Sequence, residues 1–236
     1  MKVLTILGKD IELVRTKRRT LGLEVGPRGI KARAPLRMPE HEIIAFIHSK
    51  ERWLNKVLGA MPEPRPNKSL ALQTGDKILF EGKTLRLQII EGSRDRVRIE
   101  SSTLVVPVIK SHTPIGQRVK TKLVKWFKQQ ATLQCQLRAE FYAPRMNLAS
   151  RKHHQIYVRD YKRRWGSCDS TGKLSFNWRI MQAPPEILDY VVIHELAHCH
   201  EFNHSLKFWS LVHEQMTNYK EHEAWLHQQG YTLYQF

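Results

Sequence analysis

The sequence is poor in cysteine and has no long apolar run. Three of its 236 residues are cysteine, at positions 135, 168 and 199, and no two of them form a Cys-x-x-Cys pair. An odd number of widely spaced cysteines excludes the disulfide framework of a small secreted domain and indicates reduced thiols. The apolar run after Met1 is too short for a secretory signal, and no stretch is long enough to span a membrane. We therefore expect a cytoplasmic protein with no membrane partner.

Acidic residues are scarce over most of the chain. The net charge is +17, from 39 Lys+Arg and 22 Asp+Glu. From Ala183 onward there are two lysines against seven acidic residues, a balance of −5, whereas residues 1–182 carry 37 against 15, a balance of +22. Such a field attracts polyanions, so nucleic acid or a nucleotide is a candidate partner, beside the simpler role of charge in solubility.

Hydrophobic periodicity divides the chain into three regions and indicates an α+β protein. Residues 1–60 alternate in the strand period and then change to a helical stripe from Pro39 to Leu58. The proline-rich segment at 61–67 opens a second β region that extends to 112. Residues 113–236 begin with a long helix to about Tyr142, followed by two short strands, 155–159 and 173–179, and further helices. No internal repeat is visible.

The long helix carries one apolar and one basic side. Arg118, Lys122 and Lys125 share a face that is either a phosphate contact or plain solvated surface. On the apolar side we expect Ile115, Val119, Leu123, Phe127, Leu133, Leu137 and Phe141.

The motif His194-Glu195-Leu196-Ala197-His198 predicts a metal site. Residues four apart on a helix lie on one face, so both histidines can offer a ring nitrogen to one ion. His204 can supply a third nitrogen if the helix ends before it. Three protein ligands and one open position are typical of a hydrolytic Zn²⁺ site, one ion per chain. Glu195 is then placed to deprotonate a metal-bound water. A solvated, histidine-rich helix is the alternative, and the apolar residues before the motif disfavour it.

Several segments of the second half resemble the YgjP-like family of zinc metallopeptidases, which is related to the SprT-like proteases. They are Arg164-Trp165-Gly166-Ser167-Cys168, the strand from Leu174 to Arg179, the His-Glu motif, and Asn203-His204-Ser205 with Phe208-Trp209. The resemblance implies a zincin-like metallohydrolase domain, with the active-site helix packed on a small, mainly antiparallel sheet behind a β-rich N-terminal region.

The same resemblance implies roles for individual residues. His194, His198 and His204 become zinc ligands, Glu195 the catalytic base, and a protein or peptide the substrate. It also implies a link to DNA-associated proteolysis, which the basic front part suits. The histidine spacing also matches the metzincins, but Glu201 stands where they have a glycine and no Met-turn is evident, which argues against a secreted metzincin.

Further candidates flank the motif. Substrate contacts are assigned to Arg163, Arg164, Trp165 and Phe176, and the strand at 173–179 either offers an exposed edge to an extended peptide or is internal. The residue that stabilises the oxyanion stays open among Tyr161, Tyr190, His213 and Tyr219.

Three functions are compatible with the sequence. A zinc-dependent metallopeptidase is favoured. The alternative is a metal-dependent phosphohydrolase that acts on nucleoside triphosphates, clamped by Arg159, Lys162, Arg163 and Arg164. The third is a nucleic-acid-binding protein with a structural zinc, which would not need Glu195 beside an open position.

Overall fold

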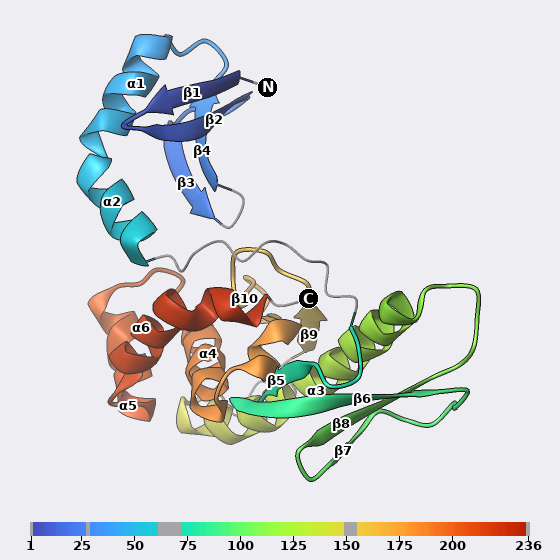
Figure 1. The fold of residues 1–236 in the computed structure, drawn as a ribbon. Coiled ribbons are helices and arrows are strands. Elements are labelled where there is room, and N and C mark those ends of the chain that lie inside the picture. Colours follow the sequence, from blue (N-terminus) through green and yellow to red (C-terminus); the bar gives the residue numbers. More distant parts are fainter. Residues whose placement is uncertain (1, 27–28, 61–71, 149–154, 235–236) are drawn as a thin grey trace. The chain divides into compact units, whose positions relative to one another are not determined.

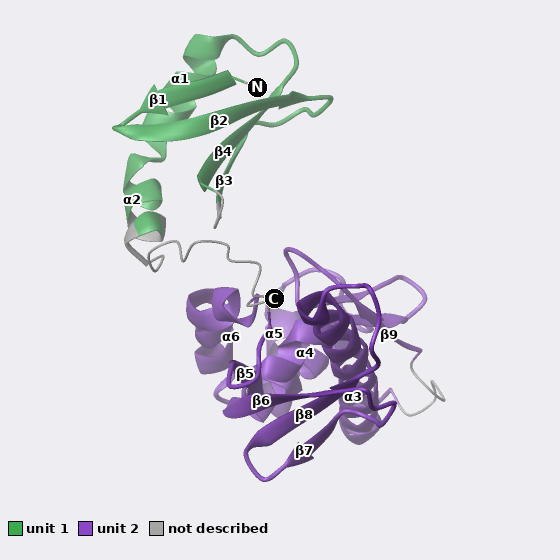
Figure 2. Cartoon of the chain, turned by 45° about the vertical axis from the view of Figure 1, so that its right-hand side comes forward, with its two compact units in different colours: residues 1–68 green, residues 69–236 purple. Residues whose placement is uncertain are grey.

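The chain forms two compact units, residues 1–68 and 69–236 (Figures 1 and 2). The computed structural model describes residues 2–26, 29–60, 72–148 and 155–234. The sequence suggested a separate region at 61–112, but the strands between 77 and 108 share one hydrophobic core with the helices that follow them. The three expected regions are therefore two.

Unit 1 is a four-stranded sheet whose core is completed by two helices. The strand order is β1-β2-β4-β3, with β2 and β4 parallel and the outer pairs antiparallel. The helical stripe expected as one helix is broken at Lys50, which leaves the helical conformation. The elements are β1 (Lys2–Ile6), β2 (Lys9–Thr16), β3 (Gly22–Gly26), β4 (Gly29–Pro35), α1 (Glu40–Ser49) and α2 (Glu51–Ala60).

The first sheet of unit 2 repeats that topology. Its strands are β5 (Lys77–Phe80), β6 (Lys83–Glu91), β7 (Arg98–Glu100) and β8 (Thr103–Val108). Their order is β5-β6-β8-β7, again with a parallel inner pair and antiparallel outer pairs. In both sheets the first hairpin turns on two residues with positive φ, Leu7-Gly8 and Glu81-Gly82. Each sheet precedes a helix that follows a proline. The two sheets therefore share one topology, although no repeat is visible in the amino-acid sequence.

Helix α3 (Ile115–Arg145) buries Val119, Leu123 and Phe127 as expected, but Ile115 is 40% exposed and the second half of the helix buries a different side. Leu133, Leu137 and Phe141 are 53%, 50% and 51% exposed, so assigning them to the apolar side was wrong. Small side chains four residues apart take the buried positions in this half of the helix, and they permit close packing with α4 (Pro185–Ala197). They are Ala131, Cys135, Ala139 and Ala143.

A small three-stranded sheet and the last helices complete unit 2. The sheet contains β9 (Ile156–Arg159), β10 (Gly166–Cys168) and β11 (Leu174–Asn177) in the order β10-β11-β9. One pairing is antiparallel and the other parallel, so the sheet is mixed, where mainly antiparallel pairing was expected. The α+β class is confirmed. The other elements are 3₁₀ helices at Trp178–Gln182 and Gly230–Leu233, and helices α5 (Leu206–Gln215) and α6 (Tyr219–Gln229).

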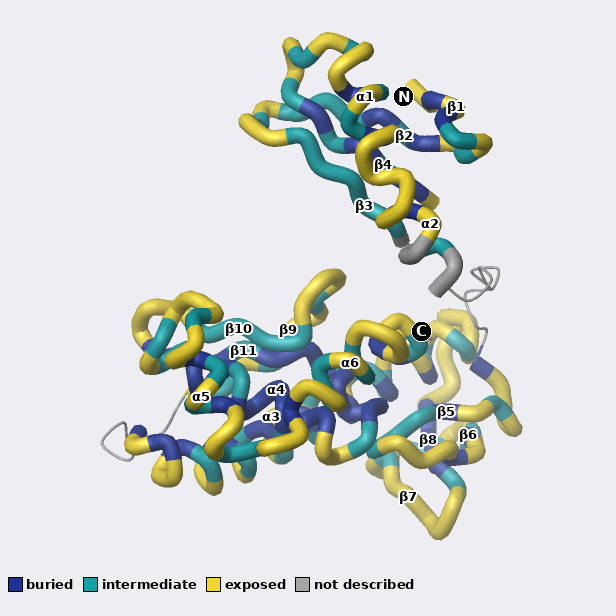
Figure 3. The backbone as a smooth tube through the Cα atoms, turned by 90° about the vertical axis from the view of Figure 1, so that its left-hand side faces the viewer, coloured by how far each residue is buried: buried dark blue, intermediate teal, exposed yellow. Residues whose placement is uncertain are grey.

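Helix α4 lies at the centre of unit 2. It contacts α3, α5, α6 and β10, and most of its side chains are buried (Figure 3). Within the described ranges, no helix combines the length and the apolar character that a membrane crossing requires.

Candidate metal centre

The chain reverses direction directly after α4, and this reversal brings His204 back to the helix. Helix α4 ends at Ala197 and is capped by His198. The backbone N–H of Glu201 then donates to the Ala197 carbonyl at 3.0 Å, which closes a turn. Asn203 accepts from the Ser205 N–H at 3.0 Å, and Ser205 in turn caps α5. The expectation that the helix ends between the second and third histidines is met by this local geometry.

Three histidine rings converge at the end of α4. His194, His198 and His204 each offer a ring nitrogen, and these atoms lie within 4.8 Å of one another. The Nε2 atoms of His194 and His204 are 3.1 Å apart. Two nitrogens bound to one zinc ion at 2.0–2.1 Å in a tetrahedral arrangement are about 3.4 Å apart. The 3.1 Å spacing is therefore close to one edge of such a coordination tetrahedron.

His194 and His198 are held in the neutral form that favours metal binding. The Nδ1 atom of His198 hydrogen-bonds the Glu201 carbonyl at 3.0 Å, and a carbonyl only accepts, so the proton sits on Nδ1 and Nε2 keeps its lone pair. Burial, and then the neighbouring His198 and His204, lower the pKa of His194 to about 3. Burial also lowers the pKa of His198. Neutral imidazoles are the form that a metal ion binds.

Glu195 is held against strand β10. Its side chain is only 5% exposed, and burial raises its pKa to about 8, against the opposing effects of the Arg164 charge and a hydrogen bond from the Cys168 backbone. A Cβ atom at Gly166 would lie 2.5 Å from the Glu195 Oε1 atom. Only glycine leaves room for the carboxylate there. The sequence did not predict this strand, because three residues carry no periodic signal.

Two aromatic residues of α5 support the histidines, a role that the sequence did not identify. The buried Phe208 ring lies 4.6–4.9 Å, centroid to centroid, from all three imidazoles. Trp209 stacks on His204 at 5.7 Å and on Tyr219 at 5.1 Å. These rings fix the orientation of the imidazoles and give them an apolar surround. In the sequence, Phe208 and Trp209 were noted only as part of a segment that resembles the family.

The four residues expected to contact substrate differ in exposure and surroundings. Arg163 and Arg164 are exposed, and Arg164 lies over the Tyr161 ring at 5.3 Å. Trp165 is half-buried and packs 5.6 Å from the Tyr234 ring. Phe176 is fully buried in the core, so we withdraw it as a substrate contact. Its strand, β11, is the central one and is paired on both sides, so the exposed-edge hypothesis for 173–179 is wrong.

The four oxyanion candidates occupy different surroundings. Tyr190 and Tyr219 are 4% and 9% exposed, and burial raises the pKa of Tyr190. The exposed His213 lies 6.2 Å from the Tyr219 ring. The Tyr161 hydroxyl pairs with Ser167 Oγ at 3.1 Å, which connects it to the strand that holds Glu195.

Comparisons with known proteins bear on this geometry. The family described as "YgjP-like, metallopeptidase domain" matches residues 19–229. No curated protein matches the chain. A similar solved structure is that of the metallopeptidase zymogen of Pyrococcus abyssi abylysin. It is 20% identical, and the alignment covers 43% of this chain and 89% of that one, with a TM-score of 0.32.

Proposed function

The chain belongs to the YgjP-like metallopeptidase family, and from that premise we propose that it hydrolyses peptide bonds with zinc as its metal. The observation that carries the proposal is the convergence of three ring nitrogens within 4.8 Å beside a buried carboxylate. The donors His194, His198 and His204 are all nitrogen, which suits zinc rather than the oxygen-seeking magnesium or calcium. Three ligands leave one position for water or substrate, as in catalytic zinc sites.

Glu195 performs the proton transfers in this proposal. A zinc ion held by the histidines supplies Lewis-acid activation of the peptide carbonyl and of water. The Glu195 carboxylate takes a proton from the attacking water and gives it to the leaving amine. Burial raises the pKa of this carboxyl, and a cation bound by the histidines would favour its ionised form, which is the form that accepts a proton. Gly166 and the Cys168 backbone hold the carboxylate in place during both transfers.

The substitution Glu195→Gln tests the role of this carboxylate. The amide is isosteric but takes up no proton, so turnover of an unfolded protein substrate should fall by about 10²–10⁴-fold while bound zinc stays at one per chain. Glu186→Gln is the matched control, because Glu186 is exposed in the first turn of the same helix. Full turnover in Glu195→Gln would contradict the mechanism.

The same assay separates peptide from phosphate substrates. Arg163 and Arg164 are exposed on the segment that leads into β10, which is the placement a phosphate clamp would need. We expect cleavage of unfolded protein and no chelator-sensitive hydrolysis of nucleoside triphosphates. Triphosphate hydrolysis without peptide cleavage would replace the peptidase proposal with the phosphohydrolase.

A further inference from the structure

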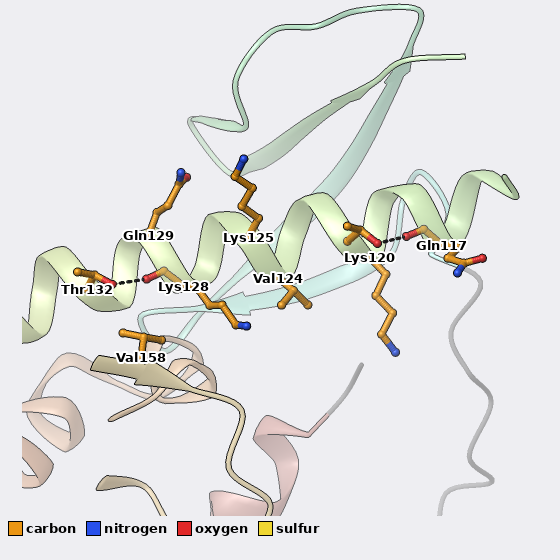
Figure 4. Close-up of a pocket in the computed structure, with 9 residues that line it drawn as sticks. Gln117, Lys120, Val124, Lys125, Lys128, Gln129, Thr132 and Val158 are labelled. Carbon is orange, nitrogen blue, oxygen red and sulfur yellow. Dashed lines mark hydrogen bonds between the residues drawn. The ribbon is translucent and has the colours of Figure 1, made fainter. Parts of the chain in front are cut away.

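A groove of about 930 Å³ runs along α3 and against strand β9 (Figure 4). We call it the α3 groove. Lys120, Lys125 and Lys128 line it, together with two glutamines, two threonines and two valines, one of which is Val158 of β9. None of the described residues that line it is acidic or aromatic.

Among the residues that the structure describes, the three lysines of the α3 groove have no acidic partner. None of the described carboxylates lies within 4.0 Å of their ammonium groups, which is the limit for an ion pair. Two neighbouring basic residues of α3, Arg118 and Lys122, do have partners. Arg118 pairs with Glu91 at 2.8 Å, and Lys122 donates to the Asp95 carbonyl at 2.7 Å. Of the basic face that the sequence indicated, two members therefore secure the β5–β8 sheet to α3, and only Lys125 belongs to the groove.

The spacing of these charges suits a nucleic-acid strand. Lys120 and Lys128 are eight residues apart on α3, about 12 Å along the axis at 1.5 Å per residue. One strand of a duplex advances about 3.4 Å per phosphate, so Lys120 and Lys128, which extend to the same side of α3, span about three to four phosphates, while Lys125 extends to the opposite side (Figure 4). The glutamine and threonine side chains between them are the neutral donors that commonly contact phosphate oxygens.

The composition of the groove distinguishes among polyanions. Protein interfaces are anchored by Trp, Tyr and Arg, and single-stranded nucleic acid stacks its bases on aromatic rings. The α3 groove offers neither. We propose that the α3 groove binds the sugar–phosphate backbone of double-stranded nucleic acid, independently of base sequence and of the peptidase activity.

A second basic hollow provides a matched control. It has a volume of about 350 Å³ in unit 1, and its lining includes Lys17, Arg19 and Arg37. Substituting these three residues removes the same charge as substituting the three lysines of the α3 groove. If binding is specific to the α3 groove, only the substitution of its three lysines removes the contribution of that groove. If binding reflects diffuse basic charge, both triple substitutions weaken it equally.

Binding of a fluorescent mixed-sequence DNA duplex to the full-length, zinc-loaded protein tests the proposal. Anisotropy titrations from about 50 to 200 mM NaCl give the slope of log K against log salt, and each phosphate contact contributes about −0.9. In K120Q/K125Q/K128Q we expect the slope to become shallower by about 2.7 units. The K17Q/R19Q/R37Q protein should keep the contribution of the α3 groove, and K120R/K125R/K128R should bind like the wild type.

Three results would overturn this assignment. One is an unchanged slope in K120Q/K125Q/K128Q, with zinc content and thermal melting also unchanged. A second is an equal loss in both triple variants, which indicates diffuse charge. The third is displacement of the duplex by polyglutamate of equal charge as readily as by unlabelled duplex, which indicates an acidic protein partner.

Discussion

Glu195 occupies space that a side chain at position 166 would fill. The Oε1, Cγ and Cδ atoms of Glu195 all lie within 2.7 Å of where a Cβ of residue 166 would stand. The glycine is therefore required by this close approach, since Gly166 has no positive φ. The site depends on a residue that has no functional group of its own.

Gly166→Ala should force the Glu195 side chain to move. We expect it to destabilise the protein by about 1–3 kcal/mol, the usual cost of overpacking, and to lower turnover while zinc remains bound. In a Glu195→Ala background the added methyl has room, so the stability cost should vanish. Urea unfolding of the four proteins of this cycle measures the coupling. Equal costs in both backgrounds would show that the contact does not matter.

At the scale of elements, local patterns could be predicted and long-range pairings could not. The helix that carries His194 and His198 follows from spacing alone, and so does the Ser205 cap of α5. The parallel pairings, by contrast, join strands whose neighbours are set by the whole fold. Strand β10 was not predicted because it is only three residues long, yet the carboxylate of Glu195, the proposed base, packs against its Gly166.

Helix α3 shows why periodicity can select the wrong side. Large apolar residues usually mark the buried face of a helix, but in the second half of α3, which contacts α4, the buried positions are occupied by small side chains. Ala139 is fully buried, whereas Leu137 is 50% exposed. The ion pair between Arg138 and Asp189, at 2.9 Å, lies on the same helix pair.

Ala139→Leu and Leu137→Ala test this reversed packing. The first should destabilise the protein by about 1–3 kcal/mol, because the extra methylenes have no space between α3 and α4. The second should change the free energy of unfolding by no more than about 0.5 kcal/mol, as is usual for surface positions. Chemical denaturation of both variants measures the difference. A larger loss of stability in Leu137→Ala would show that the large apolar residues of α3 are buried, which would contradict this packing.

The whole molecule combines two units with separate cores and a shared strand order. The core of unit 1 lies within residues 4–54, and that of unit 2 within residues 72–233. The histidines, Glu195, β10 and the supporting α5 all belong to unit 2. The family match begins at residue 19 and so includes most of unit 1.

A fragment of residues 69–236 should therefore retain the metal centre. We expect it to unfold in one cooperative transition and to bind one zinc ion with the affinity of the full chain, because every ligand and the surrounding core are present. Calorimetry and zinc titration of the fragment against the full chain measure this. Loss of cooperative unfolding or a much weaker zinc affinity would show that unit 1 completes the site.

Zinc stoichiometry and affinity test the central claim most directly, namely that three imidazoles bind one ion. Elemental analysis of the purified protein should give one zinc per chain, and His204→Ala should weaken binding by about 100-fold or more, since losing even an outer-shell partner costs 10–100-fold. His227→Ala is the control, because His227 is exposed on α6, outside the cluster. Protein that binds no zinc, or His204→Ala protein with wild-type affinity and stoichiometry, would contradict the account.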